Sequence, residues 1–286
     1  FQFCNLCEVN VSDVETQQEL NDRVVAATLI GTLQASYTNF HYLRDVWRRT
    51  TEKDALLGVG MTGIGSGRVQ QFDLEATSKL AVETNKYYAT EIGVKPAARI
   101  TTVKPSGTTS CVLGTSSGVH AWHNDYYVRR IRVGKNEAIY TYLTLRHPEL
   151  VHDDFFKPET QAVISIPQRA PNDGILRHET SLELLERVKD IYNRWIVPGH
   201  REGNNTHNVS CTVSVREEEW EEVGKWMWQN REYYNGIAVL PYFGGNYKQA
   251  PFEDIDKETF EGMFIKLKEV DLSNVVEVID NTNLTG

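Results

Sequence analysis

The chain has 286 residues, of which 40% are hydrophobic, so it is long enough to bury a full core. Its formal net charge of -9 argues against a general nucleic-acid binder, which would carry a basic surface. Four cysteines are too few for a disulfide scaffold and indicate a reducing compartment.

The chain lacks the sequence signals of a membrane or secreted protein. The longest apolar run, residues 24–33, is interrupted by Thr28, Gly31 and Thr32, and the first residues have no secretory signal pattern. We therefore expect no membrane association and a cytoplasmic location. The sequence starts without Met and in the middle of a pattern, which indicates a piece of a longer polypeptide.

The first third predicts two helices and a buried strand. Ser12-x-x-Glu15 is a capping-box pattern that predicts a helix start. The buried face of this helix is expected to carry Leu20, Val24, Ala27 and Gly31. A second helix runs through Val46 and Trp47. Residues 56–62, LLGVGMT, are apolar without alternation, which predicts a buried parallel strand with a glycine-rich loop at its carboxyl end.

Helices and strands continue to alternate along the chain. Residues 74–92 are helical by composition, and Gly93 is placed to end that helix. A further helix is expected at 137–147, and a buried strand at 162–166 that Pro167 stops.

The last third contains two more capping patterns, Thr180-x-x-Glu183 and Ser214-x-x-Glu217, each before a predicted helix. The first of these helices should bury Leu184, Val188, Ile191 and Trp195, and the second carries Trp220, Val223 and Met227. Strands are predicted at 208–215 and 236–240. The repeated strand–helix order predicts one α/β domain, a parallel sheet or barrel wrapped by helices, with ligands at the carboxyl ends of the strands.

One stretch combines several features of a phosphate site. Residues 100–103 read as a short β-branched strand that Pro105 ends, and small residues from Ser106 lead into an apolar segment. Glycine lets backbone N–H groups approach a ligand closely, and a helix that starts there directs unpaired N–H groups to the same point. The other interpretation is a Ser/Thr/Gly-rich loop that only caps its helix.

Four blocks of sequence carry a resemblance to a known family: FCNLCEVN, PSGTTS, GTSSGVHAWHNDYYVRRIRVGKNE and GNNTHNVSCTVS. Together they resemble the catalytic subunit of ribonucleotide reductase, specifically the adenosylcobalamin-dependent (class II) enzymes. The resemblance implies that residues 1–286 form the carboxyl-terminal half of a ten-stranded α/β barrel, with parallel strands and surrounding helices. It also implies that the substrate phosphates are held by Ser106, Gly107, Thr108 and Thr109.

Cys4 and Cys7 form a CxxC pair, which by itself suggests a metal knuckle or a dithiol. A zinc site needs two more ligands, and Cys111 and Cys211 lie far away in apolar contexts, where buried thiols are expected. No metal site is therefore predicted. The resemblance implies that Cys4 is one of the two cysteines that reduce the ribose, while Cys7 is an additional thiol that leaves open which of the two acts.

The resemblance also implies the rest of the reaction. Adenosylcobalamin generates a thiyl radical on a cysteine of an NPC-x-E pattern, which would lie upstream of Phe1 in an amino-terminal half. The substrate is a ribonucleoside di- or triphosphate, and a thioredoxin-like protein re-reduces the cysteines. This chain alone would be inactive. The alternatives are a non-catalytic half-barrel of a split enzyme that binds a complementary chain, and a phosphate-binding α/β barrel without radical chemistry.

Histidines and arginines near these blocks have two interpretations each. His120 and His123, beside the phosphate loop, and His207 either line the substrate or cofactor side or make internal hydrogen bonds. The same choice applies to a basic cluster, which serves a polyphosphate or is simply solvated. This cluster consists of Arg129, Arg130, Arg132 and Lys135.

Overall fold

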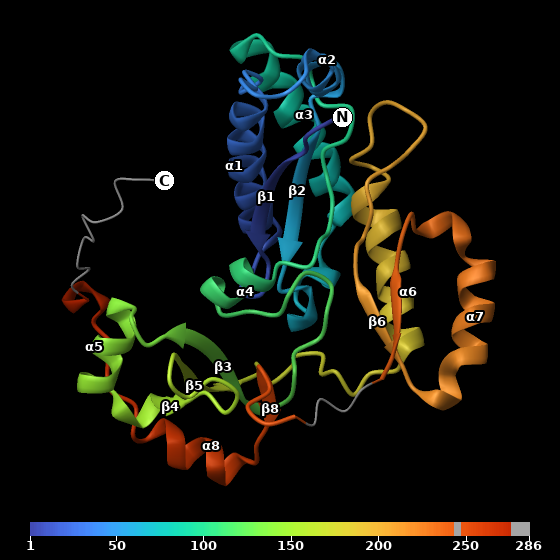
Figure 1. The fold of residues 1–286 in the computed structure, drawn as a ribbon. Coiled ribbons are helices and arrows are strands. Elements are labelled where there is room, and N and C mark those ends of the chain that lie inside the picture. The colour runs from blue at the N-terminus through green and yellow to red at the C-terminus, as the bar shows by residue number, and fades with distance from the viewer. Residues whose placement is uncertain (243–246, 276–286) are drawn as a thin grey trace. The chain divides into compact units, whose positions relative to one another are not determined.

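The computed structural model describes residues 1–242 and 247–275, which group into two compact units. Unit 1 comprises Phe1–Trp122 and Pro171–Tyr242, and unit 2 comprises His123–Ala170 and the chain from residue 243 onward (Figure 1). The sequence predicted one domain. Unit 2 is built from two separated segments, and the chain returns to unit 1 between them. The boundary is therefore not marked by a linker that could be recognised from its composition.

Parallel pairing organises the strands of unit 1. β1 (Asn5–Asn10) pairs in parallel with β2 (Leu57–Thr62), and β6 (Thr212–Val215) with β7 (Ala238–Pro241). Between these pairs runs the extended segment 99–103. It forms parallel bridges from Thr101 to Val59 and from Val103 to Val209. The expected strand at 100–103 is therefore an extended segment held by bridges, and it connects the two pairs into one series of parallel contacts.

Six α-helices belong to the described part of unit 1: α1 (Gln17–Ala35), α2 (Asp45–Asp54), α3 (Leu74–Ile92), α4 (Gly107–Leu113), α6 (Ser181–Ile191) and α7 (Trp220–Gln229). α1 packs against β1, β2 and α3, and its side chains Leu20 and Val24 are fully buried. A π-helical turn, Tyr192–Ile196, extends α6 and buries Trp195 completely. None of the helices described could span a lipid bilayer, since none combines the necessary length and apolarity.

Trp195 ties the helical layer to the extended segment. Its indole N–H donates to the carbonyl oxygen of Thr102 at 3.0 Å, and its own carbonyl oxygen accepts from the hydroxyls of Ser78 (2.7 Å) and Thr101 (2.5 Å). The indole N–H and the carbonyl oxygen of this buried residue are thus both hydrogen-bonded. The buried stripe expected on the 180–195 helix is confirmed, because Leu184, Val188, Ile191 and Trp195 are all buried.

Unit 2 contains an antiparallel sheet, in the order β4-β5-β3-β8. The strands are β3 (Tyr126–Gly134), β4 (Val151–Asp153), β5 (Gln161–Arg169) and β8 (Phe252–Asp254), and the helices are α5 (Ala138–Arg146) and α8 (Lys257–Phe264). A small core of its own holds the unit together, formed by Val133, Leu143, Leu150, Ala162 and Ile164.

The prediction that all strands run parallel is wrong for unit 2. Strand–helix alternation does not fix strand direction, and here α5 is followed by the short β4, which reverses the chain to pair antiparallel with β5. Pro167 was expected to stop the strand but lies inside β5. It faces Val128 of β3, and because β4 pairs only with residues 162–164, the proline occupies a stretch with one neighbouring strand.

Two helix-end signals are confirmed and two are wrong. Gly93 ends α3 in the left-handed region (φ 81°), and Thr180 with Glu183 forms a complete capping box. α1 is instead capped by Thr16, whose side chain accepts from the N–H of Glu19, while Ser12 bonds to Asn10. The same Ser/Thr-x-x-Glu pattern occurs twice in succession there, and only the second copy adjoins the helix. Ser214 lies within β6 and caps nothing.

Gly199 packs tightly against the extended segment 99–103. A Cβ on Gly199 would collide with the side chain of Thr101, whereas a Cβ on Gly224 in α7 would meet nothing within 4 Å. We predict that Gly199→Ala lowers the free energy of unfolding by about 2 kcal/mol. Gly224→Ala should raise it by about 1 kcal/mol, because alanine favours a helix. Urea unfolding measures both, and equal effects would contradict the packing described.

Candidate functional site

Successive side chains of β1 point to opposite faces, and this separates Cys4 from Cys7. Cys7 faces α1, since a Cβ on Gly31 would lie 3.3 Å from its sulfur. Cys4 lies on the other face, where a Cβ on Gly58 of β2 would be 3.2 Å from its sulfur. We call this side of β1 and β2 the Cys4 face; it also carries Leu6 and Glu8.

The two thiols differ in their surroundings as well as in direction. Burial of the sulfur raises the pKa of Cys4 to about 11, an effect that the positive charge of Arg99 partly offsets, although the residue as a whole is exposed. Burial also raises the pKa of Cys7, and the charge of Glu8 adds to this. Both thiols are therefore protonated at neutral pH.

The loop that precedes α4 is anchored by the buried Ser106. Its hydroxyl lies 2.6 Å from the hydroxyl of Thr62 at the end of β2, and its N–H donates to the hydroxyl of Ser117 at 2.8 Å. The predicted helix is found as α4, Gly107–Leu113, but it begins within the PSGTT motif, at its glycine, and not after it. A Cβ on Gly107 would meet no atom within 4 Å, so the protein itself leaves this position open.

The loop 114–118 is fastened to the same end of β2. The hydroxyl of Thr62 donates to the carbonyl oxygen of Ser116 at 3.0 Å and accepts from the N–H of Gly118 at 3.1 Å. The buried hydroxyls of Thr115 and Ser116 have no hydrogen-bond partner among the described residues. The structure thus gathers both Ser/Thr/Gly-rich loops at the carboxyl end of β2, where ligands are expected in parallel α/β folds.

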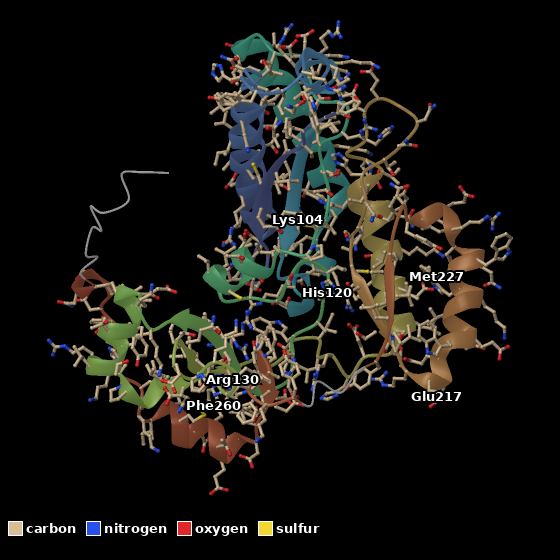
Figure 2. The ribbon with its side chains drawn as sticks, viewed as in Figure 1. Lys104, His120, Arg130, Glu217, Met227 and Phe260 are labelled. Atoms are coloured by element: carbon tan, nitrogen blue, oxygen red, sulfur yellow. The ribbon has the colours of Figure 1, made fainter. Side chains whose placement is uncertain are left out.

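Glu8 is a charged residue of this face that the sequence analysis missed. Its side chain is only 6% exposed, and its Oε2 lies 2.9 Å from Nζ of Lys104, which immediately precedes the loop. The strand period offered a signal, because Glu8 stands four residues after Cys4 and so shares its face. Lys104 is labelled in unit 1 in Figure 2.

The two histidines that follow the loop in sequence, His120 and His123, have different surroundings. Nδ1 of His120 donates to the carbonyl oxygen of Ser117, and its Nε2 accepts from the N–H of Thr212 on β6, so both ring nitrogens are used within unit 1 (Figure 2). Burial lowers the pKa of His120. His123 belongs to unit 2, where its ring stacks on Phe252.

His207 is hydrogen-bonded to the extended segment 99–103. Its Nδ1 donates to the carbonyl oxygen of Thr101 at 3.1 Å. Burial lowers its pKa to about 4, and the nearby charge of Arg99 contributes to the decrease. His207 is therefore neutral at physiological pH and holds the segment that leads to the loop.

The basic cluster lies on β3 and, for Lys135, directly after it in unit 2, and its charges already have partners. Arg130 pairs with Glu253 (2.5 Å), Arg132 with the buried Asp154 (2.8 Å) and Lys135 with Asp153 (2.6 Å), and the guanidinium of Arg129 lies 4.3 Å from the centre of the Phe252 ring. These pairs stabilise the unit's own sheet, so they do not favour the polyphosphate interpretation. Of the two cysteines expected to be buried, Cys211 is buried but Cys111 is exposed on α4.

A comparison with solved structures supports the fold. The crystal structure of a B12-dependent (class II) ribonucleotide reductase matches 96% of this chain with a TM-score of 0.76 and 22% identity. This shows a mixed α/β fold that corresponds to part of that enzyme. The chain covers 41% of the matched structure.

Comparisons with curated proteins point to the same enzymes. The adenosylcobalamin-dependent ribonucleoside-triphosphate reductase of Lactobacillus acidophilus is 28% identical over 90% of this chain. That of Lactobacillus helveticus is 28% identical over 98% of it. No protein-family model matches the chain. The chain is a distant homologue of these class II ribonucleotide reductases and spans about 40% of their length.

The low pKa of His207 makes stability depend on pH. Between pH 6.5 and 4 the unfolded chain binds a proton at this histidine and the folded chain does not, so stability is complete above pH 6.5 and falls as the pH decreases. We predict that lowering the pH from 7 to 5 costs about 2 kcal/mol through this residue. Urea unfolding at both pH values should show a smaller loss in His207→Gln. The exposed His41→Gln is the control, and an unchanged loss in His207→Gln would contradict the assignment.

Proposed function

We propose that this chain takes part in the reduction of ribonucleotides to deoxyribonucleotides by a thiyl-radical mechanism, supplying the substrate-phosphate loop and one reducing cysteine. The observation that carries the proposal is the arrangement of β1 and β2. Cys4 and Glu8 share one face of the strand pair, and Ser106 is hydrogen-bonded to the carboxyl end of β2. The distant homology to class II ribonucleotide reductases agrees with this arrangement.

In the proposed site, Ser106, Gly107, Thr108 and Thr109 bind the phosphates of a ribonucleoside di- or triphosphate. The first residues of a helix have N–H groups without intrahelical partners, and phosphate oxygens accept hydrogen bonds from such groups. The open space at Gly107 supports close approach of a ligand to the backbone. His120 and His207 are positioning residues in this proposal, because their hydrogen bonds hold the loop and the extended segment in place.

Cys4 provides one of two thiols. Reduction of the ribose removes its 2′ hydroxyl as water and requires two electrons and two protons, which two thiols supply when they close into a disulfide. The raised pKa of Cys4 keeps its proton on the sulfur at neutral pH. Cys7 faces α1 on the opposite side of β1 and cannot approach the same substrate, so the second thiol comes from another part of the enzyme.

The radical chemistry belongs to adenosylcobalamin, on which the homologous enzymes depend by name. We assign none of the described residues a step through the cofactor. This chain's share is to bind and orient the nucleotide and to hold the proton of Cys4.

The complete enzyme requires other parts. Within the described residues, β1 has the single neighbouring strand β2, and β7 has the single neighbour β6, so both ends of the parallel series expose an edge. Exposed edges need cover, and five parallel segments would form the carboxyl-terminal half of a ten-stranded barrel. The amino-terminal half with the radical cysteine would close the barrel, and a thioredoxin-like protein in the cytoplasm would re-reduce the disulfide.

The same open edges also favour a second function, a non-catalytic half-barrel that binds a complementary chain. It would need the edges but neither the thiol of Cys4 nor the open space at Gly107. The substitutions Gly107→Val and Cys4→Ser therefore distinguish the two functions.

Gly107→Val tests the phosphate loop in the full natural polypeptide that contains this chain. A Cβ at this position would meet no protein atom within 4 Å, so the melting temperature should change little, but the valine side chain should obstruct the approach of phosphate to the backbone. We predict that nucleotide affinity falls by about tenfold or more, which corresponds to 1.4 kcal/mol. Gly262→Val in α8, which is equally free of neighbours, is the matched control. Unchanged affinity in Gly107→Val would refute the loop assignment.

Cys4→Ser tests the reducing role in the same polypeptide. Turnover with thiol reductants should be abolished, because the hydroxyl cannot form a disulfide, while nucleotide binding is retained. Cys7→Ser is the matched control and should have a mild effect. Sustained turnover in Cys4→Ser, or loss of turnover only in Cys7→Ser, would contradict the assignment.

A further inference from the structure

The carboxylate of Glu8 lies in an environment that is unusual for a buried charge. Only 6% of the Glu8 side chain is exposed to solvent. Within the described residues, neither carboxylate oxygen accepts a hydrogen bond of good geometry. Its compensation is the ammonium of Lys104, 2.9 Å away. Because an uncompensated buried carboxylate is strongly unfavourable, the charge state of Glu8 depends on where this ammonium lies.

Lys104 is placed where it can serve two anions. Its side chain is 28% exposed, so it is less deeply buried than the side chain of Glu8. In sequence it directly precedes Pro105 and Ser106 of the loop. Lys104 therefore contacts the buried carboxylate and stands only two residues before Ser106, where the proposed function locates the substrate phosphates.

Besides Lys104, the ionisable group that shares the face of Glu8 is Cys4. β2, with the sequence LGVGMT, contains none, and a Cβ on Gly60 would lie 3.0 Å from Oε2 of Glu8. The ionisable residue of α4 is Cys111, and on β1 itself Cys7 responds to the charge of Glu8 but points toward α1. Burial raises the pKa of the Glu8 carboxyl, and Lys104 and Ser106 offset part of this increase.

We propose that Lys104 is shared between Glu8 and the phosphates of the bound nucleotide, and that Glu8 takes up a proton when the nucleotide draws Lys104 toward the loop. The inference deepens the proposed function and rests on it. In the free protein the pair is carboxylate and ammonium. In the complex the ammonium contacts phosphate, and a proton from the buffer converts the carboxylate of Glu8 to a carboxyl group. The buried face then holds no uncompensated negative charge beside the phosphates.

Calorimetry detects this proton directly. Nucleoside triphosphate is titrated into the full natural polypeptide at pH 7 in buffers that differ in ionisation enthalpy, and the slope of the apparent binding enthalpy gives the number of protons taken up. We expect Glu8→Gln to bind the nucleotide with an uptake lower than that of the wild type by about half a proton to one proton. The corresponding nucleoside, which lacks phosphates, should show no such difference between the two proteins.

The chain offers a matched control in the Glu221–Lys225 pair, which has a similar distance of 2.8 Å but is exposed on α7. Glu221→Gln should leave the uptake unchanged. If Glu8→Gln does not fold, Lys104→Met serves instead. It should also abolish the uptake, because Glu8 is then protonated before the ligand arrives, and it should weaken nucleotide binding by about tenfold or more.

The outcomes distinguish this inference from the proposed function. Nucleotide binding with the same proton uptake in the wild type and Glu8→Gln, or a loss of uptake in Glu221→Gln, would overturn the role of Glu8 and leave the nucleotide site intact. Absence of nucleotide binding by the wild-type polypeptide would refute the proposed function and this inference together.

Discussion

The hydrogen bonding of the extended segment 99–103 is the constraint on which unit 1 depends. On one side it bonds to β2, where the N–H of Val59 donates to the carbonyl oxygen of Ile100 at 2.8 Å. On the other side the N–H of Val103 donates to the carbonyl oxygen of Asn208 at 3.1 Å. The indole N–H of Trp195 donates a further hydrogen bond to this segment, to the carbonyl oxygen of Thr102. Because Lys104 follows directly, this segment also positions Lys104 and the proposed phosphate loop near the end of β2.

The two-residue period of β1 then decides which chemistry is available. It sends Cys4 and Glu8 to one face and Cys7 to the other, against α1. A shift of the register by one residue would exchange the two thiols and move the buried carboxylate away from Lys104. Both the fold and the proposed site therefore depend on the register in which β1 pairs with β2, which begins with Asn5 opposite Leu57.

The sequence predicted these parts unevenly, for physical reasons. Local signals were sufficient where they act locally: Gly93 ends its helix, and the apolar run 56–62 forms a buried parallel strand. Strand direction in unit 2 depends on long-range pairing, which the strand–helix order does not encode, and the duplicated Ser/Thr-x-x-Glu pattern made the start of α1 ambiguous. At the candidate site, the residue types of the loop pointed to phosphate, whereas the role of Glu8 became visible only from its burial and its distance to Lys104.

The central claim is that Cys4 is oxidised as the ribose is reduced, and mapping of the disulfide formed in a single turnover tests it most directly. The pre-reduced full polypeptide would receive nucleotide and adenosylcobalamin without external reductant, followed by alkylation of free thiols and mass spectrometry of the peptides. We predict that Cys4 becomes protected from alkylation in a disulfide with a cysteine outside residues 1–286, while Cys7 remains alkylated. Deoxyribonucleotide formation with Cys4 still free, or with Cys7 in the disulfide, would contradict it.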